Sequence, residues 1–127
     1  MAVDTEYDSV NRFVLQAYSG VNTMQDYVAG TVKVFEMFAE HGTADCLLDL
    51  RKIDNRASMV QVYDLPQMYT EMAGPRNIRI SILAEPGQKD EAIIRFYETI
   101  CLNRGWKAQI SFDAESAVAW LTGNPAG

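Results

Sequence analysis

Residues 44–58 read ADCLLDLRKIDNRAS and combine the features that decide the fold. Cys46–Leu50 is a short apolar run bounded by polar residues, which is typical of a buried strand. We expect Arg51–Ala57 to follow as a charged loop and a helix to begin near Ser58. In open α/β sheets, ligands bind at the carboxyl ends of the strands, so this loop is the predicted working surface.

Strand and helix patterns alternate on both sides of this segment. Ala2–Tyr7 and Arg12–Tyr18 are candidate strands, and the turn-forming residues between them predict an antiparallel hairpin. Thr23 has the sequence context of a helix cap, and Gly42 is the expected left-handed end of that helix. Further elements are expected as a helix at 58–72, a strand at 78–83, a helix from Asp90 to Gly105, a strand at 107–112 and a helix at 114–121.

The order of these elements, β-β-α-β-α-β-α-β-α, predicts an α/β domain with a five-stranded mixed sheet. Strands that alternate with helices pair in parallel through right-handed crossovers, which leaves the first hairpin strand antiparallel. Ile78, Ile80 and Ile82 point to one face of their strand. Arg79 and Ser81 point to the other, whereas a parallel strand covered on both faces would be apolar throughout. We therefore expect the helices mainly on one face of the sheet and a partly open, polar second face.

The helix pattern at 58–72 is interrupted by Pro66, which has no backbone N–H to donate. Asp64 has cap chemistry, so we expect a new helix to begin there with Pro66 in its first turn. The segment is rich in Met and Tyr, which usually pack in a core and which also form adaptable binding surfaces. The candidate wall for an apolar ligand consists of Met59, Tyr63, Met68, Tyr69 and Met72.

Size and charge narrow the class of protein. The 127 residues predict one domain, 1–127, and 48% hydrophobic content is enough for one packed core. A net charge of -6 argues against a nucleic-acid partner. No apolar run approaches the roughly 20 residues that span a bilayer, and the acidic start of the chain is unlike a signal peptide. We therefore expect a cytoplasmic protein, with Cys46 and Cys101 as reduced core residues.

The residues that usually carry catalysis are scarce. His41 is the only histidine, which excludes a histidine-based triad or a two-histidine metal site unless the protein oligomerises around it. Its place in the last turn of a helix favours a structural role. The chain shows no nucleophile–base pair and no phosphate-binding loop. We therefore expect no enzymatic activity, no metal and no cofactor.

Several segments together resemble a known family. They are the opening hairpin, Leu47–Leu50 as the central strand, Asn77–Leu83 as the next strand, and the ending Ile110–Leu121 with its Phe-Asp, Ala and Trp-Leu pattern. On these segments the chain resembles the STAS domain superfamily, SpoIIAA-like, and more narrowly its stand-alone bacterial STAS/SEC14-like proteins. The resemblance covers nearly the whole chain and implies an α/β fold of successive strand–helix units.

The resemblance also bears on the loop after the central strand. Regulatory STAS domains carry an Asp-Ser-Ser/Thr-Gly type motif there, in which one Ser or Thr is phosphorylated. Here Asp54 matches the motif's Asp, Asn55 replaces the serine beside it, and the glycine is absent. The resemblance to SEC14-like proteins implies binding of a lipid or a small ligand, but it assigns no binding residues in this sequence.

Two functions follow as hypotheses. The first is a non-enzymatic protein-interaction or regulatory module, whose partner is another protein or a second copy of the chain. The alternative is a binder of a small apolar ligand or lipid through residues 59–72. A homodimer would use helices or the sheet edge, because the polar sheet face suits a large dry interface poorly. The candidate binding loop consists of Asp54, Asn55, Arg56 and Ser58.

Overall fold

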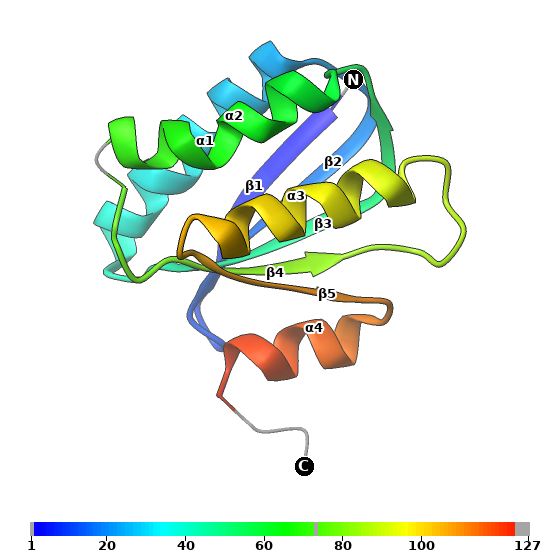
Figure 1. The fold of residues 1–127 in the computed structure, drawn as a ribbon. Coiled ribbons are helices and arrows are strands. Elements are labelled where there is room, and N and C mark those ends of the chain that lie inside the picture. The colour runs from blue at the N-terminus through cyan, green and yellow to red at the C-terminus, as the bar shows by residue number, and fades with distance from the viewer. Residues whose placement is uncertain (1, 73, 124–127) are drawn as a thin grey trace.

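The computed structural model describes residues 2–72 and 74–123. Its elements follow the predicted order (Figure 1). The strands are β1 (Ala2–Asp8), β2 (Phe13–Asn22), β3 (Asp45–Asn55), β4 (Arg79–Leu83) and β5 (Lys107–Ser111). The helices are α1 (Met24–His41), α2 (Met59–Glu71), α3 (Glu91–Asn103) and α4 (Ala114–Leu121).

The strands form one mixed sheet in the order β1-β2-β3-β4-β5. β1 pairs antiparallel with β2, and every later pair is parallel, as the sequence predicted. Helices α1, α2 and α3 lie on one face of the sheet, and α4 lies on the other (Figure 1). The prediction of helices mainly on one face is therefore confirmed, with α4 as the exception.

The expectation of an open second face is wrong where α4 packs. Ser81 is fully buried there and donates a hydrogen bond to the carbonyl oxygen of Ala117. Arg79 is only half exposed, because its guanidinium binds Asp45 and the carbonyl oxygen of Leu121 at the end of α4. The Ser81 hydroxyl and the Arg79 guanidinium both donate to backbone carbonyl oxygens of α4. This polar face therefore accepts a helix with these polar groups paired. Towards the sheet edge, Lys107 and Gln109 are exposed as expected.

The helix ends follow the predicted capping chemistry. Thr23 and Asp26 form a capping box at the start of α1, and Gly42 ends that helix in the left-handed conformation with φ of 66°. Ser58 caps α2 and Asp113 caps α4. Each cap satisfies a backbone amide that has no partner within its helix.

The central strand is longer than the sequence predicted. We expected a loop from Arg51, but β3 continues to Asn55, so that prediction is wrong. β2 also continues to Asn22, and beyond a register shift near Ala17 it pairs with the extension of β3. On the other edge of the extension, the Gln88 side chain donates to the carbonyl oxygen of Leu50. Backbone pairing with β2 on one edge and the Gln88 side chain on the other therefore keep a charged segment extended.

Helix α2 is continuous through Pro66, so the prediction of a new helix at Asp64 is wrong. Proline inside a helix costs roughly 3 kcal/mol, because it removes one hydrogen bond and crowds the preceding turn. Burial offsets that cost: Pro66 is among the most buried side chains, and Val62 and Leu65 pack in the core. The carbonyl oxygen of Pro66 also accepts a hydrogen bond of 3.2 Å from the Trp106 indole.

The remaining structural predictions concern single residues. Cys46 and Cys101 are free and buried, as expected. His41 ends α1 and stacks on Tyr7 with a centroid separation of 3.9 Å, which confirms its structural role. Among the described residues, no helix is long and apolar enough to cross a lipid bilayer.

Candidate functional site

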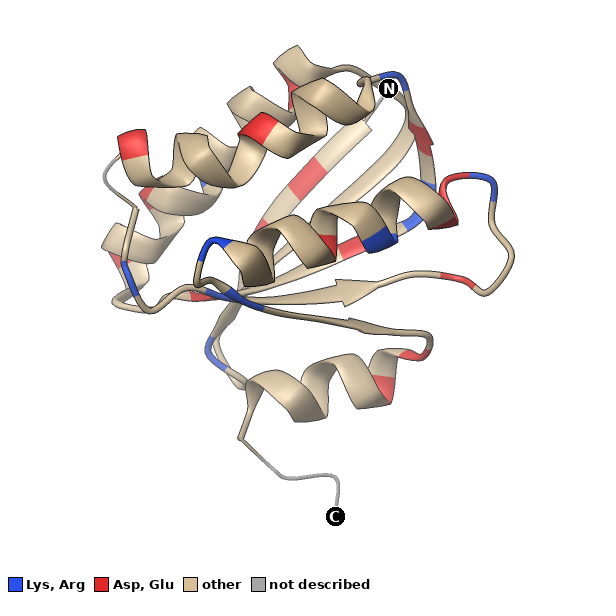
Figure 2. Ribbon diagram, viewed as in Figure 1, with Lys and Arg blue, Asp and Glu red and all other residues tan. Residues whose placement is uncertain are grey.

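The candidate loop residues lie where β3 ends and α2 begins. Asp54 pairs with Arg56 and with Lys89 from the loop before α3. These pairs lower the pKa of the Asp54 carboxyl, with the Lys89 hydrogen bond as the largest cause. All three side chains stay well solvated, and acidic and basic positions are mixed on α3 and the loop before it (Figure 2). Exposed ion pairs of this kind add little to stability.

Asn55 has a different role from its neighbours. Its side-chain oxygen accepts hydrogen bonds from the Tyr27 hydroxyl at 2.6 Å and from the Ala57 amide at 3.1 Å. Its side-chain nitrogen donates to the carbonyl oxygen of Ala57 at 2.8 Å. Its own backbone amide donates to the Asp90 carboxylate at 2.8 Å. Asn55 therefore joins the end of β3 to α1 and to the start of α3.

Ser58 acts as a helix cap. Its hydroxyl oxygen accepts from the Gln61 amide at 3.1 Å, and the Gln61 side chain accepts from the Ser58 amide at 2.9 Å. Replacing Ser58 with alanine is expected to lower the free energy of unfolding by about 1 kcal/mol. Ser58→Asp should keep the stability of the parent chain, because aspartate is also a good cap. Urea unfolding checks both values, and equal losses in the two variants would contradict the capping role.

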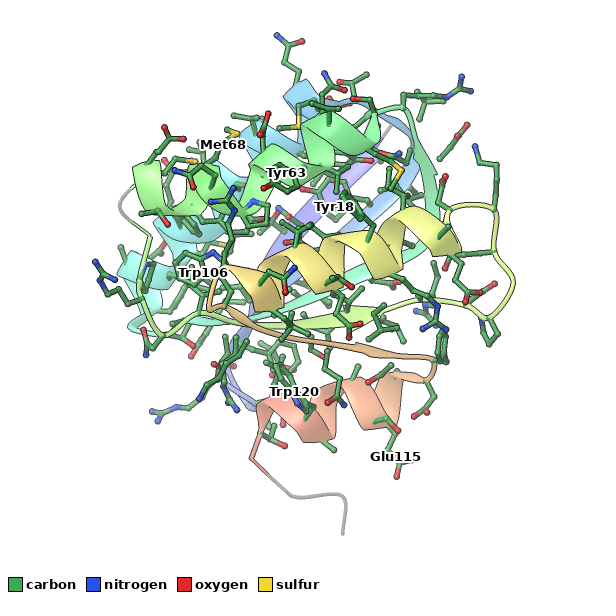
Figure 3. The ribbon with its side chains drawn as sticks, viewed as in Figure 1. Tyr18, Tyr63, Met68, Trp106, Glu115 and Trp120 are labelled. Carbon is green, nitrogen blue, oxygen red and sulfur yellow. The ribbon has the colours of Figure 1, made fainter. Side chains whose placement is uncertain are left out.

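An apolar cavity of about 100 Å³ lies between the sheet and the helices α1, α2 and α3. The cavity is partly open to solvent. Tyr18, labelled in Figure 3, lines the cavity from β2 and packs against Tyr27 of α1. Most of the lining side chains are aliphatic or aromatic. Residues of this lining include Val34, Phe38, Leu50, Val62, Leu65, Ile80 and Ile94.

Several polar groups line the cavity, and most of them are paired. The Tyr69 and Tyr97 hydroxyls hydrogen-bond to each other at 2.6 Å and so join α2 to α3. Tyr27 is held by Asn55, which also lines the cavity. Gln16 donates from its side-chain nitrogen to Thr5 and to the carbonyl oxygen of Gly30, both at 2.9 Å. These hydrogen bonds therefore tie together the six elements β1, β2, β3, α1, α2 and α3.

Burial keeps the acidic groups of the lining neutral. It raises the pKa of the Tyr69 and Tyr97 hydroxyls well above the usual value, and the Cys46 thiol is shifted in the same direction. Burial is also the largest cause of the raised pKa of Tyr18. A low-dielectric surrounding disfavours the charged form of each group. The Cys46 thiol is therefore a poor nucleophile at neutral pH.

The structure places the proposed ligand wall only partly on this cavity. Tyr69 lines it, whereas Met68 packs against the core beside it. Met59 and Tyr63 face solvent on the outside of α2. Met72 lies instead beside a shallow depression against α1. The sequence reasoning missed Val62 and Leu65, although they share a helix face with Tyr69 at spacings of three and four residues.

The described part of the chain contains no group of three or more His, Cys, Asp or Glu residues that could hold a metal ion. Among the described residues, no Asp, Glu, His, Lys or Arg side chain lines the cavity. Its polar groups are hydroxyls, amides and one thiol. Such a surface can form hydrogen bonds and apolar contacts with a small molecule.

No protein-family model and no curated protein matches the sequence. One solved structure that is similar is an uncharacterized protein of the DUF3478 family from Shewanella loihica PV-4, described as having a SpoIIAA-like fold. The TM-score is 0.62 at 19% sequence identity, and the match covers 94% of this chain and 92% of that chain. The architecture predicted from the resemblance is thereby confirmed: this chain has a SpoIIAA-like fold.

Proposed function

We propose that this domain binds a small apolar molecule in the cavity between the sheet and α1, α2 and α3. The observation that carries the proposal is the cavity itself, a partly open space of about 100 Å³ lined by core side chains. Protein interiors normally leave few voids larger than a water molecule. An empty apolar space costs stability, because the surrounding atoms lose contacts that a ligand restores.

The size of the cavity indicates the size of the ligand. A cavity of roughly 150 Å³ lined by apolar side chains is enough to bind benzene. At about 100 Å³ and partly open, this cavity fits a molecule of about one small ring or a short chain. A whole phospholipid would require α2 or α3 to move. The small-ligand form of the hypothesis is therefore favoured over the lipid form.

The lining favours binding over catalysis. General acid–base chemistry needs a group whose pKa lies near the working pH. The ionisable groups that line the cavity are tyrosines and Cys46, and burial shifts the pKa of the central ones upward, away from neutrality. We therefore propose a non-enzymatic domain.

The proposal predicts that filling the cavity abolishes ligand binding. Val62→Phe adds a ring at a position that is 4% exposed and lines the cavity. The matched control is Val60→Phe on the same helix, at a position that is 73% exposed. Toluene at about 100 times its dissociation constant should stabilise the parent chain and Val60→Phe by about 2.7 kcal/mol. We expect no stabilisation of Val62→Phe in thermal unfolding.

Equal stabilisation of the two variants would place the toluene outside the cavity. Loss of toluene binding in Val60→Phe alone would place it on the outer face of α2. Either result would overturn the proposed site. Native mass spectrometry of the purified chain provides an independent check, because a retained molecule of small mass supports the cavity directly.

A protein-interaction module remains the second candidate, on one observation. Met59, Val60 and Tyr63 expose an apolar strip on the outside of α2, 48–73% exposed, and apolar residues are enriched in the buried centre of interfaces. The inner face of the same helix lines the cavity. Light scattering distinguishes the candidates: a homodimer that Val60→Glu dissociates supports the interaction module, and a monomer that still binds toluene supports the ligand site.

A further inference from the structure

The hydroxyl of Tyr18 stands out among the polar groups of the cavity. Tyr18 is 6% exposed, and its ring packs edge-on against Tyr27 with a centroid separation of 5.5 Å. The other tyrosine hydroxyls of the lining are engaged, by Asn55 or by each other. Within residues 2–72 and 74–123, the Tyr18 hydroxyl has no hydrogen-bond partner. Among the described residues, the side-chain oxygen of Asn22 is the one fully buried side-chain atom without a partner, so the unpartnered Tyr18 hydroxyl keeps some accessible surface on the cavity that it lines.

The surroundings of Tyr18 make room for this hydroxyl and hold it in place. A side chain at Gly30 would overlap the Tyr18 hydroxyl oxygen, so the glycine lets α1 pass directly over the phenol. Gln16 lies beside it and uses both amide hydrogens, on Thr5 and on Gly30. Gln16 therefore has only its oxygen left, as an acceptor. Among the described lining residues, the Tyr18 hydroxyl is a donor without a partner in the protein, and it is a stronger donor than the Cys46 thiol.

The charges around the cavity oppose an anionic ligand. No cationic side chain of residues 2–72 and 74–123 lines it, and Arg56 and Lys89, near its Asn55 end, are both paired with Asp54. Asp90 lies at the same end, bound to the Asn55 amide. A carboxylate bound inside would be stripped of water without a compensating charge, which is costly. A neutral molecule meets no such penalty.

We infer that the Tyr18 hydroxyl is the specificity-determining donor of the cavity, and that the ligand is a neutral apolar molecule with one hydrogen-bond acceptor, such as a ketone. The inference rests on the proposed function and names the ligand class for the same cavity. Apolar contacts select molecules that fit the space, and the single donor then distinguishes those that carry an acceptor oxygen. A site built to bond a polar group discriminates strongly against analogues that leave its polar group unpaired.

The experiment compares two probes of nearly the same shape, cyclopentanone and methylenecyclopentane, in the parent chain and in Tyr18→Phe. NMR titration gives the four dissociation constants. Tyr18→Phe should weaken cyclopentanone binding about tenfold, because the carbonyl oxygen loses its donor. The affinity for methylenecyclopentane should not change. The melting temperature should also hold, since the hydroxyl bonds to nothing in the protein. Cyclobutanecarboxylate, the anionic probe, should bind the parent chain more weakly than cyclopentanone.

The outcomes separate this inference from the proposed function. If both neutral probes bind the parent chain and Tyr18→Phe changes them by the same factor, the cavity binds ligands but Tyr18 is not the donor that selects them. If cyclobutanecarboxylate binds more tightly than cyclopentanone, the neutral ligand class is wrong. If no probe binds the parent chain, the proposed function fails and the inference fails with it.

Discussion

Replacing Asn55 with alanine is expected to lower the free energy of unfolding by about 3 kcal/mol. The change removes the acceptor of the Tyr27 hydroxyl and both side-chain bonds to Ala57. Each partner left unsatisfied in a buried or half-buried place costs about 1–3 kcal/mol. Tyr27 is the most costly of them, because it is 9% exposed and lies inside the core. Urea unfolding at neutral pH measures the loss.

The matched control is Arg56→Ala, one residue further along. Arg56 is exposed and pairs with Asp54, which keeps Lys89 as a second partner. Its loss should change the free energy of unfolding by about 0.5 kcal/mol or less. Similar small losses in both variants would mean that Asn55 does not stabilise the junction of β3, α1 and α3. A change in the slope of the Asn55→Ala transition would instead indicate a more open native or denatured state.

The order of elements could be predicted because local signals agree with one another. Cys46–Leu50 is apolar and short, and Thr23, Ser58 and Asp113 each cap the helix that the spacing of apolar residues predicted. Gly42 ends α1 in the conformation that glycine adopts most easily. Local propensity and hydrophobic period are properties of neighbouring residues, so a single sequence contains them.

The wrong predictions concern segments whose structure is decided by contacts with residues far away in the sequence. Arg51–Asn55 has the composition of a loop and becomes a strand because the end of β2 lies beside it. Asp64–Pro66 has the signals of a new helix, yet α2 continues because its inner face packs in the core. Tertiary contacts outweigh local preference in both cases.

The sequence predicted the region of the candidate site but not the contacts within it. The end of β3 does border the cavity, through Asn55, and Tyr69 of the proposed wall lines it. Val62 could have been found from its helical spacing to Tyr69. Tyr18 could not, because its significance depends on Gly30 of another element passing over it. A free hydroxyl inside a cavity is a property of packing, and no motif in the sequence records it.

Alkaline pH is expected to unfold the protein, with most of the loss of stability between about pH 9 and pH 12. Burial raises the pKa of Tyr18, Tyr27, Tyr69 and Tyr97 and of the Cys46 thiol, and it raises that of Cys101 to about 12. These groups stay protonated in the folded chain while the unfolded chain releases its protons, near pH 8.5 for cysteine and pH 10 for tyrosine. The unfolded state then binds fewer protons than the native state, so stability falls as pH rises.

Each such group contributes a loss of about 1.4 kcal/mol per pH unit once the unfolded chain has ionised and the folded chain has not. The four tyrosines together therefore remove about 5.5 kcal/mol per pH unit above pH 10, and the two cysteines add to this loss. The free energy of unfolding of a typical domain is only about 5–15 kcal/mol, so a rise of about two pH units above pH 10 suffices to unfold the chain. Circular dichroism as a function of pH measures unfolding, and the absorbance of the same samples measures tyrosinate formation. The two transitions should occur together.

The double variant Tyr69→Phe/Tyr97→Phe identifies the buried hydroxyls as the cause. The two hydroxyls bond to each other, so removing both leaves neither unpaired and should cost little stability at neutral pH. The double variant lacks two of the four contributing tyrosine protons, so near pH 11 the slope of stability against pH should fall by about 2.7 kcal/mol per pH unit. Tyr63→Phe, on the exposed side of α2, is the control and should leave the slope of the parent chain. An unchanged slope in the double variant would show that water already reaches the Tyr69–Tyr97 pair in the folded protein. Burial of these two hydroxyls would then not be the cause of the alkaline loss of stability.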